Sequence, residues 1–348
     1  MSDTVKTVVI GSSGYVGGEL LRLIAGHPQL ELVAAVSESN SGTPINSVFP
    51  HLHNALGEQC FIGPAELQQH LHGKIAIFSA APHGASAGMI ADVLAQAKNA
   101  DVNIVDVSAD FRFADSASYS AVYGEHGAPD LLDQFVCGLP EHMPNTEHPN
   151  VGHPGCFATA MLLGAVPLLQ LDLIEPELNA FGITGSTGSG QAPSTGTHHP
   201  VRNSNLYAYK PLEHRHAPEV VAICKALTGK DSTLNFIPHS GPFARGIHMT
   251  IQAKLKQPRT TEDLVAEFTD FYNHNEFVTV VSGQPKLKDV TCSNYSQIGL
   301  ATNGDSVVVF TVLDNLIKGA AGGAVQWMNR KLGFDETLGL TTPGSGWG

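Results

Sequence analysis

The chain has 348 residues, including 36 Gly and 21 Pro, and only 15% of it is charged, against about 25% in an average soluble protein. This composition excludes a coiled coil and a disordered tail. With 42% hydrophobic residues the chain can bury a sizeable core, and its length suggests two domains. The formal net charge is −13 and no run of five basic residues occurs, so neither nucleic acid nor a membrane surface is expected as a partner.

The sequence also bears on where the protein works. Its longest apolar stretch, residues 160–174, is interrupted by Pro167, Gln170 and Asp172, so no segment approaches the roughly 20 residues of a membrane-spanning helix. The first residues, MSDTVKTVVIG, lack the basic region and cleavage site of a secretory signal. The five cysteines are odd in number and show no CxxC spacing, which favours reduced thiols. A cytoplasmic protein is expected.

The first half of the chain alternates apolar, β-branched runs with segments of helical periodicity. The pattern predicts strands at residues 5–10, 30–36, 74–79 and 102–107. One helix is expected where Val16, Leu20, Leu23 and Ile24 recur at helical spacing, ending at Gly26 and Pro28, and another at 85–97. Alternating strands and helices imply a parallel sheet with helices on its faces, an α/β fold.

The character of the chain changes after about residue 155. A short helix is expected to begin near Cys156. The Gly/Ser/Thr/His-rich residues 184–205 cannot form a regular element and are too many for an idle connection. Strands at 246–253 and 306–313, joined by a helix near 261–273, indicate an α+β region, and a final helix with a stripe of small residues is predicted at 315–332.

A glycine turn follows the first predicted strand. Glycines spaced as in GSSGYVG let the backbone approach a pyrophosphate, which then lies at the positive end of the next helix. The spacing is GxxGxxG instead of GxGxxG, so a plain strand-to-helix turn is the alternative. The cofactor contacts expected here are Gly11, Ser13, Gly14, Tyr15, Val16 and Gly17.

The end of the second strand should carry the choice of cofactor, because an acid there would bind the ribose 2′-hydroxyl and reject a 2′-phosphate. Ser37, Ser39 and Asn40 supply donors that could hold a phosphate, whereas Glu38 is the acid. No arginine lies beside them. The sequence favours NADP slightly and leaves NAD open.

Cys156 stands in the motif HPGCFATA, where an apolar helix is expected to begin. A helix N-terminus favours a thiolate and can lower the pKa of a thiol, which is the condition for a nucleophilic cysteine. A buried structural cysteine is the alternative, and it is the expected role of the other four. The motif favours a nucleophile at Cys156.

Histidines are abundant, with 17 in the chain. HxH pairs at residues 51–53, 70–72 and 214–216 could approach one metal ion, but companion ligands at metal-site spacing are lacking. No metal is therefore expected. We instead expect one of these histidines to act as a general base beside a cysteine.

Three arginines lie in segments rich in Gly, Ser or Pro and could hold an anionic substrate: Arg112, Arg202 and Arg245. A guanidinium group matches phosphate and carboxylate with two parallel hydrogen bonds. Each alone could equally be a surface or ion-pair arginine. Three of them in a chain so poor in charge favour recognition of an anion.

Seven motifs in fixed order make the chain resemble a known family. GSSGYVGGELLRLIAGHP, SADFR, HPGCFATA, TGSTGSG, EHRHAPE, PFARGI and DNLIKGAAGGAVQ resemble the N-acetyl-gamma-glutamyl-phosphate reductases, within the aspartate-semialdehyde dehydrogenase-like group. The resemblance runs from about residue 6 to 333. It implies a Rossmann-type NADP-binding domain at 1–155, completed by a C-terminal segment at 315–348 whose helix returns to it, and an α+β catalytic and oligomerisation domain at 156–314.

The resemblance also implies a reaction, the reductive dephosphorylation of an acyl phosphate in arginine biosynthesis. Cys156 would attack the acyl phosphate to leave a thioester, hydride from NADPH would give a thiohemiacetal, and this would collapse to N-acetyl-glutamate semialdehyde. His216 would be the acid and base, with His214 a helper at the substrate, and which of the two is the base stays open. The family is expected to form a homo-oligomer, a dimer or a tetramer, through the sheet of the second domain.

By the same resemblance, further residues would contact the ligands. Residues 184–190 with Gly188 would lie against the nicotinamide, and Pro82 and Asn315 would contact the cofactor. Arg112, Arg202 and Arg245 would bind the phosphate and carboxylate of the substrate.

Some residues depart from the family pattern. His153 and Phe157 stand where the family often has a hydrophobic residue and a tyrosine. The stretch QAPSTGTHHPVR and the following YKPLEHRH also resemble the lysine-pathway relatives, which reduce an aminoadipyl phosphate on a small acidic carrier. The net charge of −13 disfavours an acidic carrier. A carrier-linked reductase and a non-catalytic nucleotide- or metal-binding protein are the alternatives.

Overall fold

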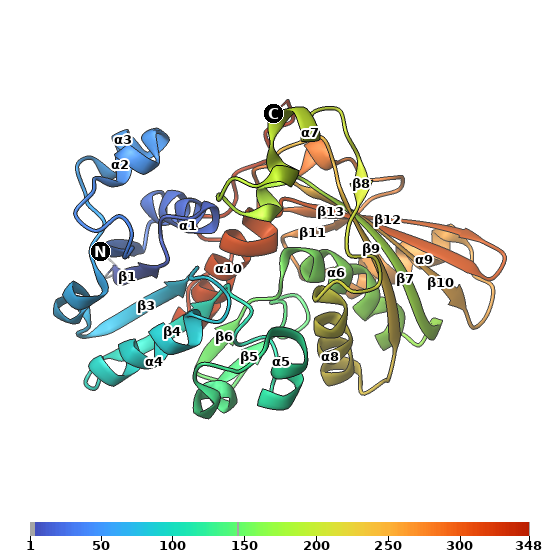
Figure 1. Cartoon of the computed structure of the whole chain (residues 1–348). Helices are drawn as coiled ribbons and strands as arrows, with labels where there is room; N and C mark the ends of the chain where they lie inside the picture. Colours follow the sequence, from blue (N-terminus) through green and yellow to red (C-terminus); the bar gives the residue numbers. More distant parts are fainter. Residues whose placement is uncertain (1–3, 145, 348) are drawn as a thin grey trace. The chain divides into compact units, whose positions relative to one another are not determined.

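The computed structural model describes residues 4–144 and 146–347, which fall into two compact units (Figure 1). Unit 1 comprises described residues 4–140, 146–154 and 320–341. Unit 2 comprises residues 141–144, 155–319 and 342–347. In the described part of the chain no helix has the length and apolar character needed to cross a bilayer.

Unit 1 is built on a parallel sheet of six strands, ordered β2-β1-β3-β4-β6-β5. The strands are β1 (Val5–Ile10), β2 (Leu30–Val36), β3 (Lys74–Ser79), β4 (Asp101–Asp106), β5 (Phe135–Cys137) and β6 (Asn150–Gly152). Its helices are α1 (Tyr15–Ala25), α2 (Ile45–Val48), α3 (His53–Leu56), α4 (Ser86–Gln96), α5 (Ser116–Tyr123) and α10 (Gly322–Leu332), with 3-10 turns at Pro50–Leu52, Pro64–His70 and Pro129–Gln134.

The parallel strands of unit 1 are buried along most of their length. Val8, Val9, Ile75, Ala76 and Ile77 are fully buried, because helices cover both faces of such a sheet and leave no polar side for the strands. The predicted α/β fold is confirmed, and the four predicted strands and the two predicted helices lie within about one residue of the observed bounds.

The C-terminal helix α10 returns to unit 1, as the resemblance implied. Its Trp327 Nε1 donates to the Gly138 oxygen at 2.9 Å, and its Asn329 Oδ1 lies 3.0 Å from His27 Nε2. The predicted start at residue 315 was wrong. A π turn, Ile317–Ala321, comes first, because the Gly319 N–H bonds to the Asp314 oxygen five residues back, at 3.0 Å.

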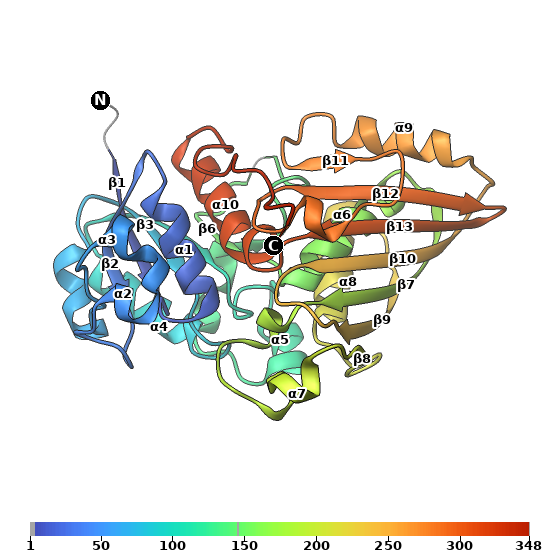
Figure 2. The ribbon, with the colours of Figure 1, turned by 90° about the horizontal axis from the view of Figure 1, so that it is seen from above.

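Unit 2 contains a mixed sheet of seven strands, ordered β11-β12-β13-β10-β7-β9-β8. Figure 2 shows its long strands side by side. The strands are β7 (Ile174–Thr184), β8 (Tyr207–Ala208), β9 (Thr233–Ser240), β10 (Ile247–Leu255), β11 (Val278–Val280), β12 (Ser296–Asn303) and β13 (Ser306–Leu313). Its helices are α6 (Cys156–Gln170), α7 (His199–Arg202), α8 (His216–Thr228) and α9 (Thr261–Phe271), with 3-10 turns at Ser186–Ser189, Thr195–Thr197 and Leu287–Asp289.

Helix α6 is the core of unit 2 and packs on one face of the sheet. An added Cβ at Gly164 would meet Ile251 on β10 at 2.8 Å and Val309 on β13 at 3.2 Å, so helix and sheet lie in close contact. The expectation of a short helix at Cys156 was wrong, since α6 has 15 residues. It is apolar all round and buried, so the polar side that marks a helix in a sequence is missing.

Candidate functional site

Cys156 is the first residue of α6. Gly155, in extended conformation, caps this helix, and the first turn carries no acidic side chain. The unpaired backbone N–H groups of a first turn favour a negative charge, and hence the thiolate form of a cysteine placed there. The Cys156 side chain is half-buried and forms no disulfide. The predicted placement of the cysteine at a helix start is confirmed.

The backbone on either side of the cysteine is held closely. The Gly155 N–H donates to Glu219 Oε1 at 2.7 Å, and the Gly155 oxygen accepts from the N–H and the hydroxyl of Thr159 at 2.7 and 3.1 Å. Gly319 in the π turn packs directly against Cys156, because a Cβ added to Gly319 would lie 2.8 Å from the Cys156 Cβ.

His214 and His216 lie beside the cysteine helix. His216 is the first residue of α8, and its backbone N–H donates to His214 Nδ1 at 3.3 Å. The two imidazole centroids are 4.8 Å apart, and both rings contact the Phe157 ring, at 5.7 Å for His214 and 6.2 Å for His216. Since Phe157 follows Cys156 directly, the fold brings the predicted nucleophile and both candidate bases into one cluster.

The two histidines differ in what they can do with a proton. Burial, helped by the positive charges of Arg215 and Lys210, lowers the pKa of His214 to about 4. His214 is therefore neutral at pH 7, and its Nδ1 is already used as an acceptor. This arrangement favours His216 as the group that moves protons.

Tyr209 belongs to the same cluster but was not predicted. Burial and the charge of the Cys156 thiolate raise the pKa of its phenol, while Arg202 and Arg215 act in the opposite sense. The Tyr209 ring lies 5.7 Å from the His214 ring. A single tyrosine in a polar loop carries no sequence signal, so only its position next to HRH could have suggested it.

Arg202 is buried, with 6% of its surface exposed. Its Nη1 donates to the Ser240 hydroxyl and its Nη2 to the Gly241 oxygen at 2.6 Å. Its buried Nε has no hydrogen-bond partner within residues 4–144 and 146–347. Arg202 and Cys156 are both among the charges that act on the pKa of the Tyr209 phenol, and the Arg202 Nε is a donor that an anion could accept.

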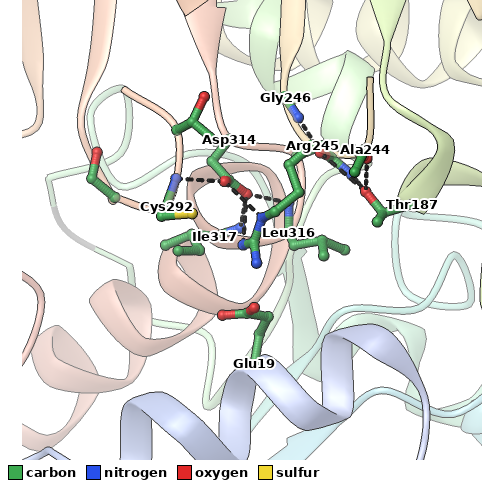
Figure 3. A network of polar contacts seen from close by, with 12 residues as sticks. Glu19, Thr187, Ala244, Arg245, Gly246, Cys292, Asp314, Leu316 and Ile317 are labelled. Atoms are coloured by element: carbon green, nitrogen blue, oxygen red, sulfur yellow. Dashed lines mark hydrogen bonds and ion pairs between the residues drawn. The ribbon is translucent and has the colours of Figure 1, made fainter. Parts of the chain in front are cut away.

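Arg245 is part of a network centred on Asp314 (Figure 3). Its Nε and Nη2 donate to the two oxygens of the fully buried Asp314 carboxylate at 3.0 and 3.1 Å. The same carboxylate accepts the backbone N–H groups of Cys292, Leu316 and Ile317 at 2.7 to 3.0 Å. Asp314 thus fixes the Arg245 guanidinium at the start of the π turn.

Asn315 joins two loops of unit 2. Its Oδ1 accepts from the Gly246 N–H at 2.6 Å, and its Nδ2 donates to the Thr187 hydroxyl at 3.0 Å. Thr187 lies in the 3-10 turn Ser186–Ser189, which also contains Gly188. Gly188, expected at the nicotinamide, and Asn315, expected to contact the cofactor, therefore lie on linked segments.

The three glycines of the turn in unit 1 have different surroundings. Gly11 has a φ of +67°, and an added Cβ would meet the Ala81 nitrogen at 2.6 Å, next to Pro82. An added Cβ at Gly17 would lie 2.4 Å from the Ser12 oxygen. At Gly14, which caps α1 in front of Tyr15 and Val16, an added Cβ would meet nothing within 4 Å, and its φ of −83° suits any residue. The space at Gly14 leaves room for a ligand.

The residues expected to select the cofactor form a single group in unit 1. Ser37 donates to the Ser13 hydroxyl at 2.9 Å, and Asn40 Nδ2 donates to the Ser39 hydroxyl at 3.0 Å. Glu38 between them is exposed. The group therefore presents hydroxyl and amide donors at the carboxyl end of β2, which is where a parallel sheet binds its ligand.

Arg112 is held inside unit 1. It is 5% exposed, its Nε donates to the His153 oxygen at 3.1 Å, and its Nη2 donates to the Val107 oxygen at 2.9 Å. The guanidinium group thus bridges the ends of β4 and β6.

The HxH pairs at residues 51–53 and 70–72 lie in unit 1. His53 contacts Asn46 at 3.0 Å and His72 contacts Lys6 at 2.6 Å. Among the described residues, no group of three or more His, Cys, Asp or Glu side chains is arranged to hold a metal ion.

Two family models match most of the chain. "Semialdehyde dehydrogenase, NAD binding domain" matches residues 6–148, and "Semialdehyde dehydrogenase, dimerisation domain" matches residues 156–315. Unit 1 is therefore a dinucleotide-binding domain of the NAD(P) type, and unit 2 carries a domain of the kind through which this family dimerises.

Solved structures support the fold. An aspartate semialdehyde dehydrogenase II of Vibrio cholerae superposes with a TM-score of 0.71 at 15% identity, over 95% of this chain and 98% of its own. An aspartate semialdehyde dehydrogenase with NADP from Candida albicans gives a TM-score of 0.63 at 14% identity, over 93% of this chain and 97% of its own.

Sequence relatives identify the family. The N-acetyl-gamma-glutamyl-phosphate reductase of Symbiobacterium thermophilum is 39% identical over 98% of this chain and 99% of its own, and that of Methanopyrus kandleri is 37% identical over 97% and 98%. Matches of this extent include the cysteine helix, the histidine helix and the glycine turn. The chain belongs to the N-acetyl-gamma-glutamyl-phosphate reductase family, oxidoreductases of the semialdehyde dehydrogenase type.

Proposed function

We propose that this chain catalyses the NADPH-dependent reductive dephosphorylation of N-acetyl-gamma-glutamyl phosphate to N-acetyl-glutamate 5-semialdehyde, a step of arginine biosynthesis. The observation that carries the proposal is the cluster in unit 2. It contains Cys156 at the start of α6 and His216 at the start of α8, whose ring contacts Phe157 and His214. The charges of Cys156 and Arg202 both act on the Tyr209 phenol, whose ring contacts His214. A nucleophile, a base and an anion contact are the three groups that acyl transfer from a phosphate requires.

In the first half of the reaction, His216 takes the proton of the Cys156 thiol and the sulfur attacks the acyl carbon. The bond from carbon to the phosphate oxygen breaks, a thioester forms, and the departing phosphate takes the proton from His216. The helix dipole of α6 stabilises the thiolate before the attack.

In the second half, NADPH, when bound, supplies the hydride that the thioester carbon accepts. The resulting oxyanion re-forms a carbonyl as the carbon–sulfur bond breaks, so the semialdehyde leaves and Cys156 returns to its thiolate. The His216 ring contacts Phe157 and the Tyr209 ring contacts His214, so these rings would limit the access of water to the thioester.

Arg202 is the substrate contact with the strongest support, since its Nε is buried and has no hydrogen-bond partner among the described residues. A phosphate or carboxylate oxygen would complete its hydrogen bonding. Arg112 and Arg245 keep their proposed role as further substrate contacts, fixed in direction by backbone oxygens and by Asp314 respectively. His214, neutral and adjacent, would complete the substrate side of the site.

For the cofactor we propose NADP, bound by the domain at residues 1–155. Ser37, Ser39 and Asn40 offer donors to a 2′-phosphate, and no carboxylate is buried among them. The turn at Gly11, Gly14 and Gly17 would hold the pyrophosphate at the N-terminus of α1. The remaining proposed contacts are Ser13, Tyr15, Val16, Pro82, Gly188 and Asn315.

We further propose a cytoplasmic homo-oligomer, a dimer or a tetramer. The face of the unit 2 sheet turned away from α6 carries Phe181, which is 41% exposed. A second sheet of the same kind would cover such a face, in keeping with the dimerisation-domain match at residues 156–315.

The direct test of the proposed function is Cys156→Ser, assayed as NADP- and phosphate-dependent oxidation of N-acetyl-glutamate semialdehyde. The hydroxyl is a far weaker nucleophile, so kcat should fall by about 10³-fold or more. Cys60→Ser, at an exposed thiol, is the matched control and should keep full activity. A Cys156→Ser protein retaining a tenth of the wild-type rate would contradict the proposal.

A further inference from the structure

A buried carboxylate of unit 1 holds the loop between β3 and α4. Asp110, in the loop after β4, has no exposed surface. Its Oδ1 accepts the Gly84 N–H at 2.7 Å, and its Oδ2 accepts the Ala87 N–H at 2.9 Å. Helix α4 begins at Ser86 after Ala85, and an alanine side chain cannot accept a hydrogen bond from the first turn. A residue from the neighbouring loop therefore caps this helix.

A second carboxylate ties the same two loops together. Asp106, fully buried at the end of β4, accepts the Ser86 hydroxyl on Oδ1 at 2.7 Å and the Ser108 hydroxyl on Oδ2 at 2.6 Å. The Ser86 hydroxyl also lies 2.6 Å from that of Ser79 at the end of β3. The Ser108 oxygen in turn accepts the Asp110 N–H at 3.0 Å. The two loops are thus joined by one continuous set of buried hydrogen bonds.

The loop between β3 and α4 lies against the glycine turn. A Cβ added at Gly11 would meet the Ala81 nitrogen at 2.6 Å, and the next residue, Pro82, is a proposed cofactor contact. In the strand order β2-β1-β3-β4, this loop and the Ser37 group at the end of β2 lie on opposite sides of β1. A dinucleotide on such a sheet places its 2′-substituted ribose at the end of the second strand. The loop therefore faces the pyrophosphate and nicotinamide half of the cofactor.

We propose that Asp110 is a positioning residue for the cofactor. By accepting the N–H groups of Gly84 and Ala87, it holds Pro82 in the place where the nicotinamide half of NADP binds. A carboxylate suits this task because its two oxygens accept two backbone bonds at once, and such charge-assisted bonds are strong. The adenosine half, held at the Ser37 group, does not depend on this loop. The inference rests on the proposed binding of NADP at residues 1–155.

The test measures the Kd of two ligands, NADP and adenosine 2′,5′-bisphosphate, which has the 2′-phosphate but no nicotinamide. Asp110→Ala removes both acceptors from the loop. We expect the Kd of NADP to rise about tenfold or more and that of the bisphosphate to stay within about twofold. Asp110→Asn keeps one acceptor oxygen and should show a smaller rise for NADP alone. It provides the comparison should the alanine variant fail to fold.

Asp115→Ala is the matched control, because Asp115 also caps a helix of unit 1. Its Oδ1 accepts the Ser118 N–H at 2.8 Å in the first turn of α5. Losing this cap should lower the melting temperature and leave both Kd values unchanged. An unchanged Kd of NADP in the folded Asp110 variants would overturn the proposal, as would an equal rise for both ligands, which a merely structural role predicts. Failure of the proposed function would appear separately, as wild-type protein that does not bind NADP.

Discussion

We propose different chemical roles for His214 and His216, which are separated by one residue. Burial and two neighbouring cations lower the pKa of His214 to about 4, so its ring has no proton to give in the neutral range. The sequence left the choice between His214 and His216 open, because HRH contains nothing that distinguishes them. The distinction arises from Arg215, Lys210 and the depth of burial, which only the folded chain defines.

His216→Asn and His214→Asn should therefore differ at the active site. Removing the proton-transfer group should lower kcat by about 10² to 10⁴-fold, whereas His214→Asn should affect mainly KM. The pH dependence of kcat between pH 5 and 9 should stay unchanged in His214→Asn, since His214 does not titrate there. Steady-state kinetics over this pH range decide the matter, and a loss of kcat confined to His214→Asn would reverse the assignment.

The turn between β1 and α1 contains two glycines with different surroundings, Gly17 in a tightly packed position and Gly14 in an open one. An added Cβ would meet the Ser12 oxygen at 2.4 Å at Gly17, but it would meet nothing within 4 Å at Gly14. The requirement for glycine at position 17 comes from the backbone. At position 14 no neighbouring atom of the described chain requires a glycine, so we attribute the glycine there to a ligand that approaches the backbone closely.

Gly17→Ala should destabilise unit 1 by about 1 to 3 kcal/mol through this clash, measured by urea unfolding. Gly14→Ala should fold with wild-type stability yet bind NADP at least about tenfold more weakly, because a methyl group would occupy the space next to the pyrophosphate. Titration of NADP by intrinsic fluorescence provides the affinity. Wild-type NADP affinity in Gly14→Ala would refute the proposed role of this turn.

Four of the six strands of unit 1 could be predicted from the sequence, whereas the three-residue strands β5 and β6 and several strands of unit 2 could not. Parallel strands covered on both faces read as continuous apolar runs, such as VKTVVI and KIAIFS. Strands β7 and β9 contain Pro176 and Pro238, and β7 carries Glu175 and Glu177 near its start. Their alternating burial leaves polar residues on one face, which weakens the pattern.

Only those residues of the candidate site that stand in recognisable sequence motifs could be predicted. Cys156 and His216 stood in recognisable segments, but Glu219 and Tyr209 lie more than fifty residues from the cysteine in sequence. Their part in the site depends on α8 and the loop before it packing against α6, which is a property of the tertiary fold. The part played by Asp314 likewise depends on the tertiary fold, because its carboxylate accepts hydrogen bonds from the Arg245 side chain and from three backbone N–H groups.

At the scale of the whole molecule, buried histidines set the stability in acid. Burial lowers the pKa of His142 to about 4, with Glu141 opposing and Lys318 assisting the shift. Its Nε2 lies 2.9 Å from the Tyr272 hydroxyl and its Nδ1 is buried. The unfolded chain binds a proton at this ring below about pH 6.5 and the folded chain does not, so the contribution is present at pH 7 and is lost as the pH falls toward 4.

His142→Gln should therefore lose less stability than the wild type between pH 7 and pH 5. The wild-type ring alone accounts for up to about 2 kcal/mol over this range. Asp106, whose pKa burial raises to about 6, has the opposite effect in both proteins and cancels in the comparison. Urea unfolding at the two pH values measures the difference, and parallel losses in the two proteins would contradict the assignment to His142.

A panel of semialdehydes identifies the substrate of this protein. Purified wild-type protein is assayed with phosphate and with NADP or NAD, on free N-acetyl-glutamate semialdehyde and on aminoadipate semialdehyde linked to an acidic carrier. We expect phosphate-dependent turnover of N-acetyl-glutamate semialdehyde with NADP preferred. Turnover confined to the carrier-linked compound, or binding of NADP without turnover of either, would contradict it.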